Sequence, residues 1–389
     1  MDEILNMSIS EMPGKTFKCS CGRMHSVGIH RIAIGGDLSD EIIDAASAFK
    51  SGGIFLIADN NTYGIHGRFV ENMLQINGLR TKSHVFNTRH PLVPDEKALG
   101  RLLMEVEKDT TLIMAVGSGT LNDIARFMSF KLHIPYMVVC TAPSMDGYAS
   151  TVSPLIVDGF KKTFEAVYPY AIIADTGVMK GAPVEMVRAG FGDIVGKMTA
   201  LTDWQLARVK NNEYYCETSV RLVRSALQKC MENAGGIEKR DEAAVGYITE
   251  ALIMSGVAMG LVGNSRPASG AEHHVAHFWE IDALAKGVEH PLHGNSVGAA
   301  SVVIAYLYEL LNDKLPAGVE APKPEEIKKL LKESGSCDNP AELGISRDLF
   351  KRSVLHAMDI RPRYTVFHLA AELGLLERYA GVLTEKFYG

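Results

Sequence analysis

The chain of 389 residues has little cysteine and tryptophan, with six and two residues respectively. Cys140, Cys216, Cys230 and Cys337 stand far apart, unlike the close spacing of a small disulfide-stapled domain. The chain also lacks a long basic run, and its formal net charge at pH 7 is −6. Since a polyanion needs a basic surface to bind, the sequence argues against nucleic acid as a partner.

Long apolar runs are also missing: no uninterrupted apolar stretch approaches the roughly 20 residues of a membrane-spanning helix. The opening segment MDEILNMSIS carries acids where a secretory signal carries basic residues. We therefore expect a cytoplasmic protein without membrane insertion. Hydrophobic residues make up 47% of the chain and charged residues 22%, so a chain of this length can bury a large core and is expected to form two domains.

Cys19 and Cys21 are the exception to the sparse cysteine pattern, because they stand close to His25 in the segment CSCGRMH. This segment could be half of a metal-binding knuckle. A structural zinc ion usually takes four ligands, however, and only three are present. We therefore expect a local turn here and keep the metal site as the alternative.

The first 180 residues alternate short β-branched runs with amphipathic stretches, which is typical of a parallel sheet covered by helices. The expected strands are IHRIAI, GIFLIAD, SHVFN, TTLIMAV and YMVVC, and the intervening helices include DEIIDAASAFK, RFVENMLQING and DEKALGRLLMEVEK. Beyond Gly181 and Pro183 the pattern changes to long helix-periodic segments. We expect an α/β domain over residues 1–180 and an all-helical domain over residues 181–389.

A glycine-containing bend follows the expected strand TTLIMAV. Gly117, Ser118 and Gly119 precede an expected helix, and the free amides of a helix N-terminus favour phosphate oxygens. A turn from strand to helix also needs glycine for geometric reasons alone, and the GxGxxG spacing of the common dinucleotide fingerprint is absent. Both interpretations of this bend stay open.

Asp59 and Asn60 follow the second expected strand. An acid at the carboxyl edge of a sheet can bind the ribose hydroxyls of a dinucleotide and favour NAD over NADP. The same two residues can instead cap the following turn, and the sequence does not separate the two roles.

The strongest local signal is a cluster of histidines within 21 residues: His273, His274, His277, His290 and His293. Ser269 and Glu272 have the spacing of a capping box, which predicts a helix start there. His273 and His277, four residues apart, then share one helix face. The histidines can be core or surface residues individually, but the cluster favours a metal site.

Asp193 is the best candidate for an acidic ligand, because it lies in the small and apolar segment AGFGDIVGK and would be costly to bury unpaired. A catalytic metal commonly takes three protein ligands and keeps an open position. Lys197, one turn further on, can instead be an ordinary salt-bridge partner of Asp193. Mixed Asp and His ligation suits zinc, nickel or ferrous iron.

Five segments together carry a resemblance to a known family: GSGTLNDIARF, TAPSMDGYASTVSPLIVDGFKKTF, AGFGDIVGK, SRPASGAEHHVAHFWE and HPLHGNSVG. Over about residues 27–310 the chain resembles the sn-glycerol-1-phosphate dehydrogenase branch of the iron-containing alcohol dehydrogenase superfamily, which is also similar to dehydroquinate synthase. The resemblance implies a dehydroquinate synthase-like fold. In that fold an N-terminal Rossmann-like α/β domain is followed by an all-α domain, and the active site lies in the cleft between them.

The resemblance also implies roles for individual residues. Metal ligands would be Asp193, His273 and His293, and catalytic groups would be His277 and Lys197. The cofactor would lie at Asp59, Gly117, Ser118, Gly119, Asp123, Thr141, Ser144 and Ser150, and Asp146 would face the substrate. His274 and His290 match no ligand position, and the CSCGRMH segment is not part of the superfamily's common pattern.

The implied reaction is the reversible reduction of dihydroxyacetone phosphate to sn-glycerol 1-phosphate by NAD(H) or NADP(H), with one divalent metal (Zn, Ni or Fe) per subunit and a homodimer or higher homo-oligomer. The substrate phosphate needs cationic partners, and the sequence offers Lys161, Lys162, Lys197 and Arg266; we favour Arg266 and Lys162. The alternatives are a glycerol dehydrogenase on the unphosphorylated substrate, a dehydroquinate-synthase-like lyase, and a non-catalytic nucleotide-binding protein.

Overall fold

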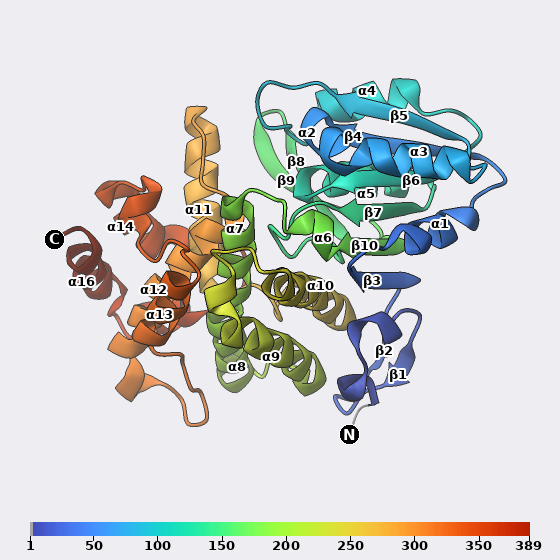
Figure 1. The fold of residues 1–389 in the computed structure, drawn as a ribbon. Coiled ribbons are helices and arrows are strands. Elements are labelled where there is room, and N and C mark those ends of the chain that lie inside the picture. The colour runs from blue at the N-terminus through green and yellow to red at the C-terminus, as the bar shows by residue number, and fades with distance from the viewer. Residues whose placement is uncertain (1–2) are drawn as a thin grey trace.

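The computed structural model of the chain describes residues 3–389, so the first two residues of the acidic opening segment lie outside it. Figure 1 shows two parts side by side. The sheet and its covering helices are drawn in blue to green, and the helices of the C-terminal half in green to red.

Six parallel strands form the main sheet, in the order β3-β10-β7-β6-β4-β5. They are β3 (Arg31–Gly35), β4 (Gly53–Asp59), β5 (Thr81–Phe86), β6 (Thr110–Gly117), β7 (Tyr136–Cys140) and β10 (Ala171–Asp175). The five predicted strands are confirmed, and β10 is a sixth that was not predicted. All five residues of β7 are buried, because a parallel sheet covered on both faces replaces alternation with continuous apolar runs.

Helices cover the two faces of this sheet: α1 (Ser39–Ser47), α3 (Arg68–Ile76), α4 (Glu96–Glu105) and α5 (Gly119–Leu132). A short segment of α2 (Asn60–Thr62) and a π-helical turn η3 (Tyr63–Gly67) joins β4 to α3. Successive residues of β4 face opposite cores: Leu56 packs in the cluster containing α1 and α3, and Phe55 in the cluster containing α4 and α5. This two-sided packing is expected from the side-chain period of two along a strand.

Two antiparallel hairpins lie outside the main sheet and were not predicted. β1 (Thr16–Lys18) pairs with β2 (Met24–Ser26), and β8 (Val152–Val157) pairs with β9 (Phe160–Glu165). The CSCGRMH segment forms the turn and second strand of the first hairpin. The expected local turn is therefore present.

From α6 (Thr176–Met179) onward the described chain contains helices and no strand, as predicted. The long helices are α7 (Val184–Val195), α8 (Lys197–Asn211), α9 (Glu217–Glu232), α10 (Glu242–Val262), α11 (Ala271–Lys286), α12 (His293–Leu310), α13 (Pro324–Glu333), α14 (Arg347–His356), α15 (Val366–Glu372) and α16 (Leu376–Tyr388). Short 3-10 turns are η1 (Glu3–Asn6), η2 (Ile9–Glu11), η4 (Ala234–Gly236), η5 (Asn312–Lys314), η6 (Pro340–Leu343) and η7 (Ala357–Ile360).

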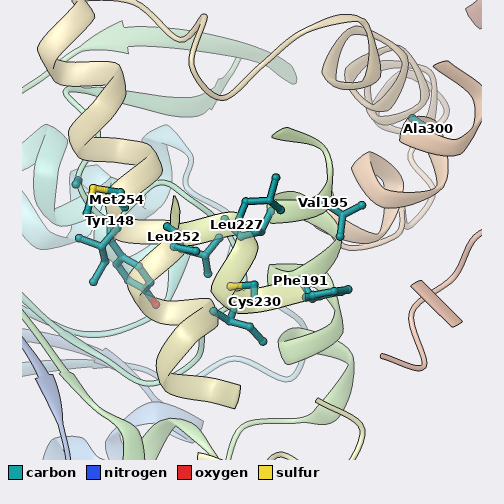
Figure 2. Close-up of a cluster of buried hydrophobic side chains, with 14 of the residues drawn as sticks. Tyr148, Phe191, Val195, Leu227, Cys230, Leu252, Met254 and Ala300 are labelled. Atoms are coloured by element: carbon teal, nitrogen blue, oxygen red, sulfur yellow. The ribbon is translucent and has the colours of Figure 1, made fainter. Parts of the chain in front are cut away.

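One hydrophobic cluster extends from the sheet through the helical half. Figure 2 shows part of it, where Phe191 of α7, Leu227 of α9 and Leu252 of α10 lie near Tyr148, which follows β7. The last strand of the main sheet ends at Asp175 and α7 begins at Val184. The division into domains at residue 180 falls between these elements and stays a prediction.

The apolar helix α10 lies in this core. It is long and apolar enough to cross a membrane, but 72% of its apolar 18-residue window is buried inside the protein. Burial of this extent is typical of a central helix in a globular fold. Its apolar face therefore packs against protein.

Glycines bring α7 and α12 close together. A Cβ added at Gly192 would overlap the carbonyl oxygen of Gly294, and one added at Gly294 would overlap the carbonyl oxygen of Ala189. Gly192 precedes the candidate ligand Asp193, and Gly294 follows the candidate ligand His293. The close crossing therefore sets the separation of two candidate metal ligands.

We predict that Gly192→Ala lowers the midpoint of thermal unfolding, because the added methyl must push α7 away from α12. Overpacking of this kind typically costs about 1–3 kcal/mol. Gly100→Ala in α4 is the matched control, since a Cβ there would have no neighbour within 4 Å and alanine favours a helix by about 1 kcal/mol. Calorimetry of both variants checks this; a Gly192→Ala variant as stable as the parent chain would contradict the packing argument.

Candidate active site

Three helices bring the predicted metal ligands together. Asp193 of α7, His273 of α11 and His293 of α12 offer ligand atoms that all lie within 4.8 Å of one another. Asp193 Oδ1 is 3.5 Å from His273 Nε2, and the ring centroids of His273 and His293 are 5.3 Å apart. One carboxylate and two imidazoles form a donor set that suits a catalytic divalent metal. The residues present therefore fit the implied ion.

The start of α11 differs from the predicted capping box. Gly270 is the N-cap, so Ser269 does not have the predicted role, and the Asp203 carboxylate accepts a hydrogen bond from the Ala271 amide at 2.6 Å instead. Glu272 instead accepts a hydrogen bond from the Gly270 amide at 2.7 Å and from the Thr199 hydroxyl at 2.8 Å. The helix nevertheless begins within two residues of the predicted position.

Glu272 also orients the first histidine. Its Oε1 lies 2.8 Å from His273 Nδ1. A proton on Nδ1 that is donated to Glu272 leaves the Nε2 lone pair free on the side of Asp193. This carboxylate–histidine arrangement is the usual support of a metal-binding imidazole. Glu272 was not predicted as a site residue, although its position beside His273 and its full burial could have indicated it.

Lys197 joins Asp193 to the sheet half. Its Nζ lies 2.6 Å from Asp193 Oδ1 and 2.8 Å from Asp146 Oδ2. The backbone amide of Asp146 donates to Asp193 Oδ2 at 3.0 Å, and the Ser255 hydroxyl of α10 donates to Asp146 Oδ2, also at 3.0 Å. Lys197 is therefore both a salt-bridge partner of Asp193 and a member of the candidate site, so the two interpretations made from sequence are compatible.

The electrostatics favour an ionised Asp193. Burial opposes its charge, but the Lys197 ammonium and the two neighbouring histidines outweigh burial and hold the pKa of this carboxyl well below its usual range. Burial lowers the pKa of His293 to about 4, which keeps that imidazole neutral at pH 7. Metal ligation needs this combination of an anionic carboxylate and an imidazole with a free lone pair.

A second group of possible ligands shares His293 and adds His277 and Glu280. His277 has a neighbour at both ring nitrogens: Nδ1 is 3.3 Å from Glu280 Oε2, and Nε2 is 3.3 Å from Nη2 of Arg361. Both oxygens of Glu280 accept from Lys161 Nζ of β9 at 2.7 Å. Because His277 is engaged on both sides, this group is a weaker metal site than the first.

The glycine bend has the geometry expected of an anion site. Gly117 ends β6 and α5 begins at Gly119, and the N-cap Ser118 makes no side-chain hydrogen bond to the first turn. The amides of that turn are thus not capped by Ser118 and are available to a phosphate. A Cβ added at Gly119 would crowd Met145 at 3.1 Å, so this glycine lets the loop after β7 pass close to the bend.

The loop of residues 141–150 carries four predicted residues: Thr141, Ser144, Asp146 and Ser150. Asp123 of α5 lies behind it, in a 2.8 Å ion pair with Arg126. Arg126 is fully buried and donates to the carbonyls of Gly147 and Tyr148. Burial raises the pKa of Asp123 to about 6 despite this arginine. Asp123 therefore positions Arg126, and Arg126 in turn fixes the conformation of the loop. Arg126 was not identified from sequence.

Asp59 adopts the capping role that the sequence left open. Its Oδ1 accepts from the amides of Asn61 and Thr62 at 2.9 and 2.8 Å, and it is the N-cap of α2. It also stands at the carboxyl end of β4. The ribose role is a separate question and stays a prediction.

The two cations favoured for the substrate phosphate are not brought to the metal cluster. Arg266 is 2% exposed and forms a bidentate pair with Glu213 at 2.6 and 2.5 Å. Lys162 is half exposed and faces Asp158 at 3.7 Å. Lys197 contacts Asp193, and Lys161 and Arg361 are the cations beside Glu280 and His277. Lys161 was considered from sequence, whereas Arg361 lies too far along the chain for any local motif to connect it with the histidines.

A cavity elsewhere on the molecule contains none of these residues. It lies between the N-terminal segment, α9 and α10, and its lining includes Met7, Arg221 and Glu242. Because this cavity is lined by other residues, its position does not support a role for the cavity in the chemistry of the histidines.

Comparison with known proteins identifies the family of this chain. A family model described as iron-containing alcohol dehydrogenase matches residues 39–183. The chain is 34% identical to glycerol-1-phosphate dehydrogenase [NAD(P)+] of Halalkalibacterium halodurans, over 91% of this chain and 96% of that protein. It is 32% identical to the protein of the same name from Geobacillus stearothermophilus, over 96% of this chain and 100% of that protein.

Solved structures show the same fold. Glycerol dehydrogenase from Schizosaccharomyces pombe superposes with a TM-score of 0.69 at 18% identity, over 91% of this chain and 90% of that chain. This similarity confirms the predicted fold class of an α/β sheet followed by helices. The relatives in turn confirm the resemblance found in the motifs.

We predict that Glu272→Gln weakens divalent metal binding by about 10- to 100-fold, the usual effect of losing a carboxylate behind a ligating histidine. The substitution keeps the shape of the side chain but removes the charge opposite His273 Nδ1. Competition with a chelator measures the affinity. Glu250→Gln, which removes a carboxylate of α10 that pairs with Lys229 of α9, is the control and should bind metal normally. Equal affinities in both variants would rule out the orienting role.

Proposed function

Since this chain belongs to the glycerol-1-phosphate dehydrogenase family, we propose that it reversibly reduces dihydroxyacetone phosphate to sn-glycerol 1-phosphate with NADH or NADPH. The convergence of Asp193, His273 and His293 on one point carries the proposal. The glycine bend at Gly117–Gly119 supports it as a site for the cofactor pyrophosphate. The cytoplasmic location and a homodimer or higher homo-oligomer remain parts of the proposal.

Asp193, His273 and His293 would hold one zinc, nickel or ferrous ion, which would act as a Lewis acid on the substrate carbonyl while the nicotinamide supplies hydride. The chain's own contribution is to prepare this site. Glu272 fixes the tautomer of His273, and Lys197 together with the Asp146 amide keeps Asp193 ionised and oriented. Preorganised charge of this kind needs no rearrangement during the reaction.

The residues beside the candidate metal ligands would handle the proton that the product hydroxyl needs. Burial, only partly opposed by Glu280, lowers the pKa of His277 well below its usual value, so this imidazole is neutral at pH 7 and can relay a proton. Lys197 stays protonated. Burial alone would lower its pKa, but the carboxylates of Asp146 and Asp193 outweigh burial and raise the pKa of Lys197 above its usual value. We assign His277 the proton-handling role and Lys197 a role in positioning Asp146 and Asp193.

Arg361 is the proposed partner of the substrate phosphate, in place of Arg266. Its guanidinium lies 3.3 Å from His277 Nε2, so it is close to the candidate metal ligands. The carboxylate–arginine pair with Glu213 engages Arg266 fully, whereas Arg361 donates to neutral groups, His277 and the Ser265 hydroxyl. A guanidinium without a carboxylate partner is well suited to bidentate phosphate binding.

The cofactor preference rests on Asp59. An acid at the end of β4 would accept hydrogen bonds from the adenosine ribose and repel a 2′-phosphate, which favours NADH over NADPH. The amides that Asp59 already caps occupy Oδ1. We therefore propose that Oδ2 faces the ribose.

We predict that chelator-treated protein loses NADH oxidation with dihydroxyacetone phosphate and regains it when zinc, nickel or iron is added back. The expected loss is nearly complete, because the ion would be the main source of electrostatic stabilisation at the carbonyl oxygen. A spectrophotometric assay followed by chiral analysis of the product checks the reaction. Activity that survives complete metal removal would refute the metal-dependent reaction, and turnover without net NADH consumption would instead favour a dehydroquinate-synthase-like lyase.

We predict that Arg361→Ala raises KM for dihydroxyacetone phosphate by roughly 10- to 100-fold, since a charge-assisted hydrogen bond contributes about 1.5–3 kcal/mol. Turnover of unphosphorylated dihydroxyacetone should change little. Arg352→Ala removes an arginine whose partners are Asp348 and Asp282 and should leave both parameters unaltered. Equal losses on both substrates in Arg361→Ala would contradict phosphate recognition, and a parent chain that prefers dihydroxyacetone would identify a glycerol dehydrogenase.

A further inference from the structure

A second set of metal-ligating side chains lies outside the candidate active site. Cys19, Cys21 and His25 of the N-terminal hairpin meet Cys216, which directly precedes α9. One ligand atom from each lies within 4.8 Å of all the others. The hairpin supplies the three ligands of the CSCGRMH segment, and the fourth comes from a residue almost two hundred positions further along the chain.

The separations of the ligand atoms fit a tetrahedral ion. With Zn–S distances of about 2.3 Å and Zn–N distances of about 2.0–2.1 Å, tetrahedral geometry separates two sulfurs by about 3.8 Å, and a sulfur from a nitrogen by about 3.5 Å. The sulfurs of Cys19 and Cys216 are 3.7 Å apart. His25 Nε2 is 3.6 Å from Cys216 Sγ and 3.2 Å from Cys21 Sγ.

The local backbone is shaped to present these sulfurs. The Cys19 amide donates to the Arg23 carbonyl at 2.9 Å, and the Gly22 amide donates to the Cys19 carbonyl at 2.9 Å. Gly22 has a φ of 89°, a left-handed conformation that suits glycine. The Cys21 amide points at Cys19 Sγ at 3.5 Å. The turn thus folds back on its own first cysteine.

The sulfurs of Cys21 and Cys216 have hydrogen-bonding neighbours outside the cluster. Cys216 is the N-cap of α9, and its sulfur accepts from the Ser219 amide at 3.5 Å. A helix N-terminus stabilises a negative sulfur. The Tyr214 hydroxyl lies 3.2 Å from Cys21 Sγ. The Trp204 indole N–H donates a hydrogen bond to the Tyr214 carbonyl at 2.8 Å. Such outer hydrogen bonds are typical supports of metal-bound thiolates.

We propose that Cys19, Cys21, His25 and Cys216 bind one structural zinc ion that fastens the N-terminal hairpin to the start of α9. Three thiolates and one imidazole complete a tetrahedral shell and leave no open position, so this ion would be structural and not catalytic. The compact spacing suits one ion better than an iron–sulfur cluster, whose iron atoms separate their cysteine ligands.

The location gives the ion a mechanical role. The cluster belongs to a small buried core that includes Trp204 of α8 and Val220 of α9, and β2 also contacts α10. Figure 1 shows the hairpin beside the N-terminus, away from α11 and α12. The ion would therefore join the segment before the first sheet strand to the helical half, independently of the catalytic metal.

Cobalt substitution tests the proposal without relying on enzymatic activity. The parent chain, expressed with cobalt replacing zinc, should show the strong thiolate-to-cobalt absorption of a cysteine-bound ion. Asp193→Asn should keep this absorption, because its lost ligand is not a thiolate. Absence of thiolate-to-cobalt absorption in the folded parent chain would overturn the proposal.

Zinc analysis of variants supplies the matched comparison. Cys21→Ser removes the most exposed ligand and should lose one tightly bound zinc per chain and melt at a lower temperature. Cys230→Ser removes a buried thiol from the same helix that bears Cys216 at its N-cap, and this thiol contacts the Tyr247 carbonyl instead; its zinc content should equal that of the parent chain. If Cys21→Ser folds and keeps all its zinc, or if mass analysis shows a Cys19–Cys216 disulfide in freshly prepared parent chain, the assignment is wrong.

Discussion

The organisation of the candidate site depends on one buried charge. The side chain of Asp193 has no exposed surface, and an ionised carboxylate without partners is very unfavourable inside a protein. Lys197 supplies the opposing charge, the Asp146 amide supplies a hydrogen bond, and His273 lies beside the same oxygen as Lys197. The carboxylate thereby ties the loop after β7 to α7, α8 and α11. A metal ion would join an arrangement that is already charged and oriented.

Close helix packing makes this convergence possible. Glycines adjoin both Asp193 and His293, and α7 and α12 touch through them with backbone against backbone. Larger residues at Gly192 or Gly294 would separate the carboxylate from the imidazole. The sheet half contributes through its loops and the β8–β9 hairpin, which place Asp146 and Lys161 against the helical half. A few ion pairs thus join the sheet half to the helices that carry the candidate metal ligands.

Local patterns in the sequence predicted much of this fold and part of the site. Continuous apolar runs identified five of the six parallel strands, and the histidine cluster with Asp193 identified the candidate ligands. The failures at the sites share a cause. Arg361 and Cys216 act through partners that are distant in sequence, and no local spacing reveals such pairs. The capping box at Ser269 failed for a related reason, because the helix has Gly270 as its N-cap and its first amide donates to Asp203, which is distant in sequence.

The most direct test of the central claim is a crystal of the metal-loaded protein measured at the absorption edge of the added ion. The account predicts an anomalous peak between Asp193, His273 and His293, with an open side facing the loop after β7. A protein that turns over dihydroxyacetone phosphate but shows its peak only between His277, Glu280 and His293, or only at the cysteine cluster, would contradict it.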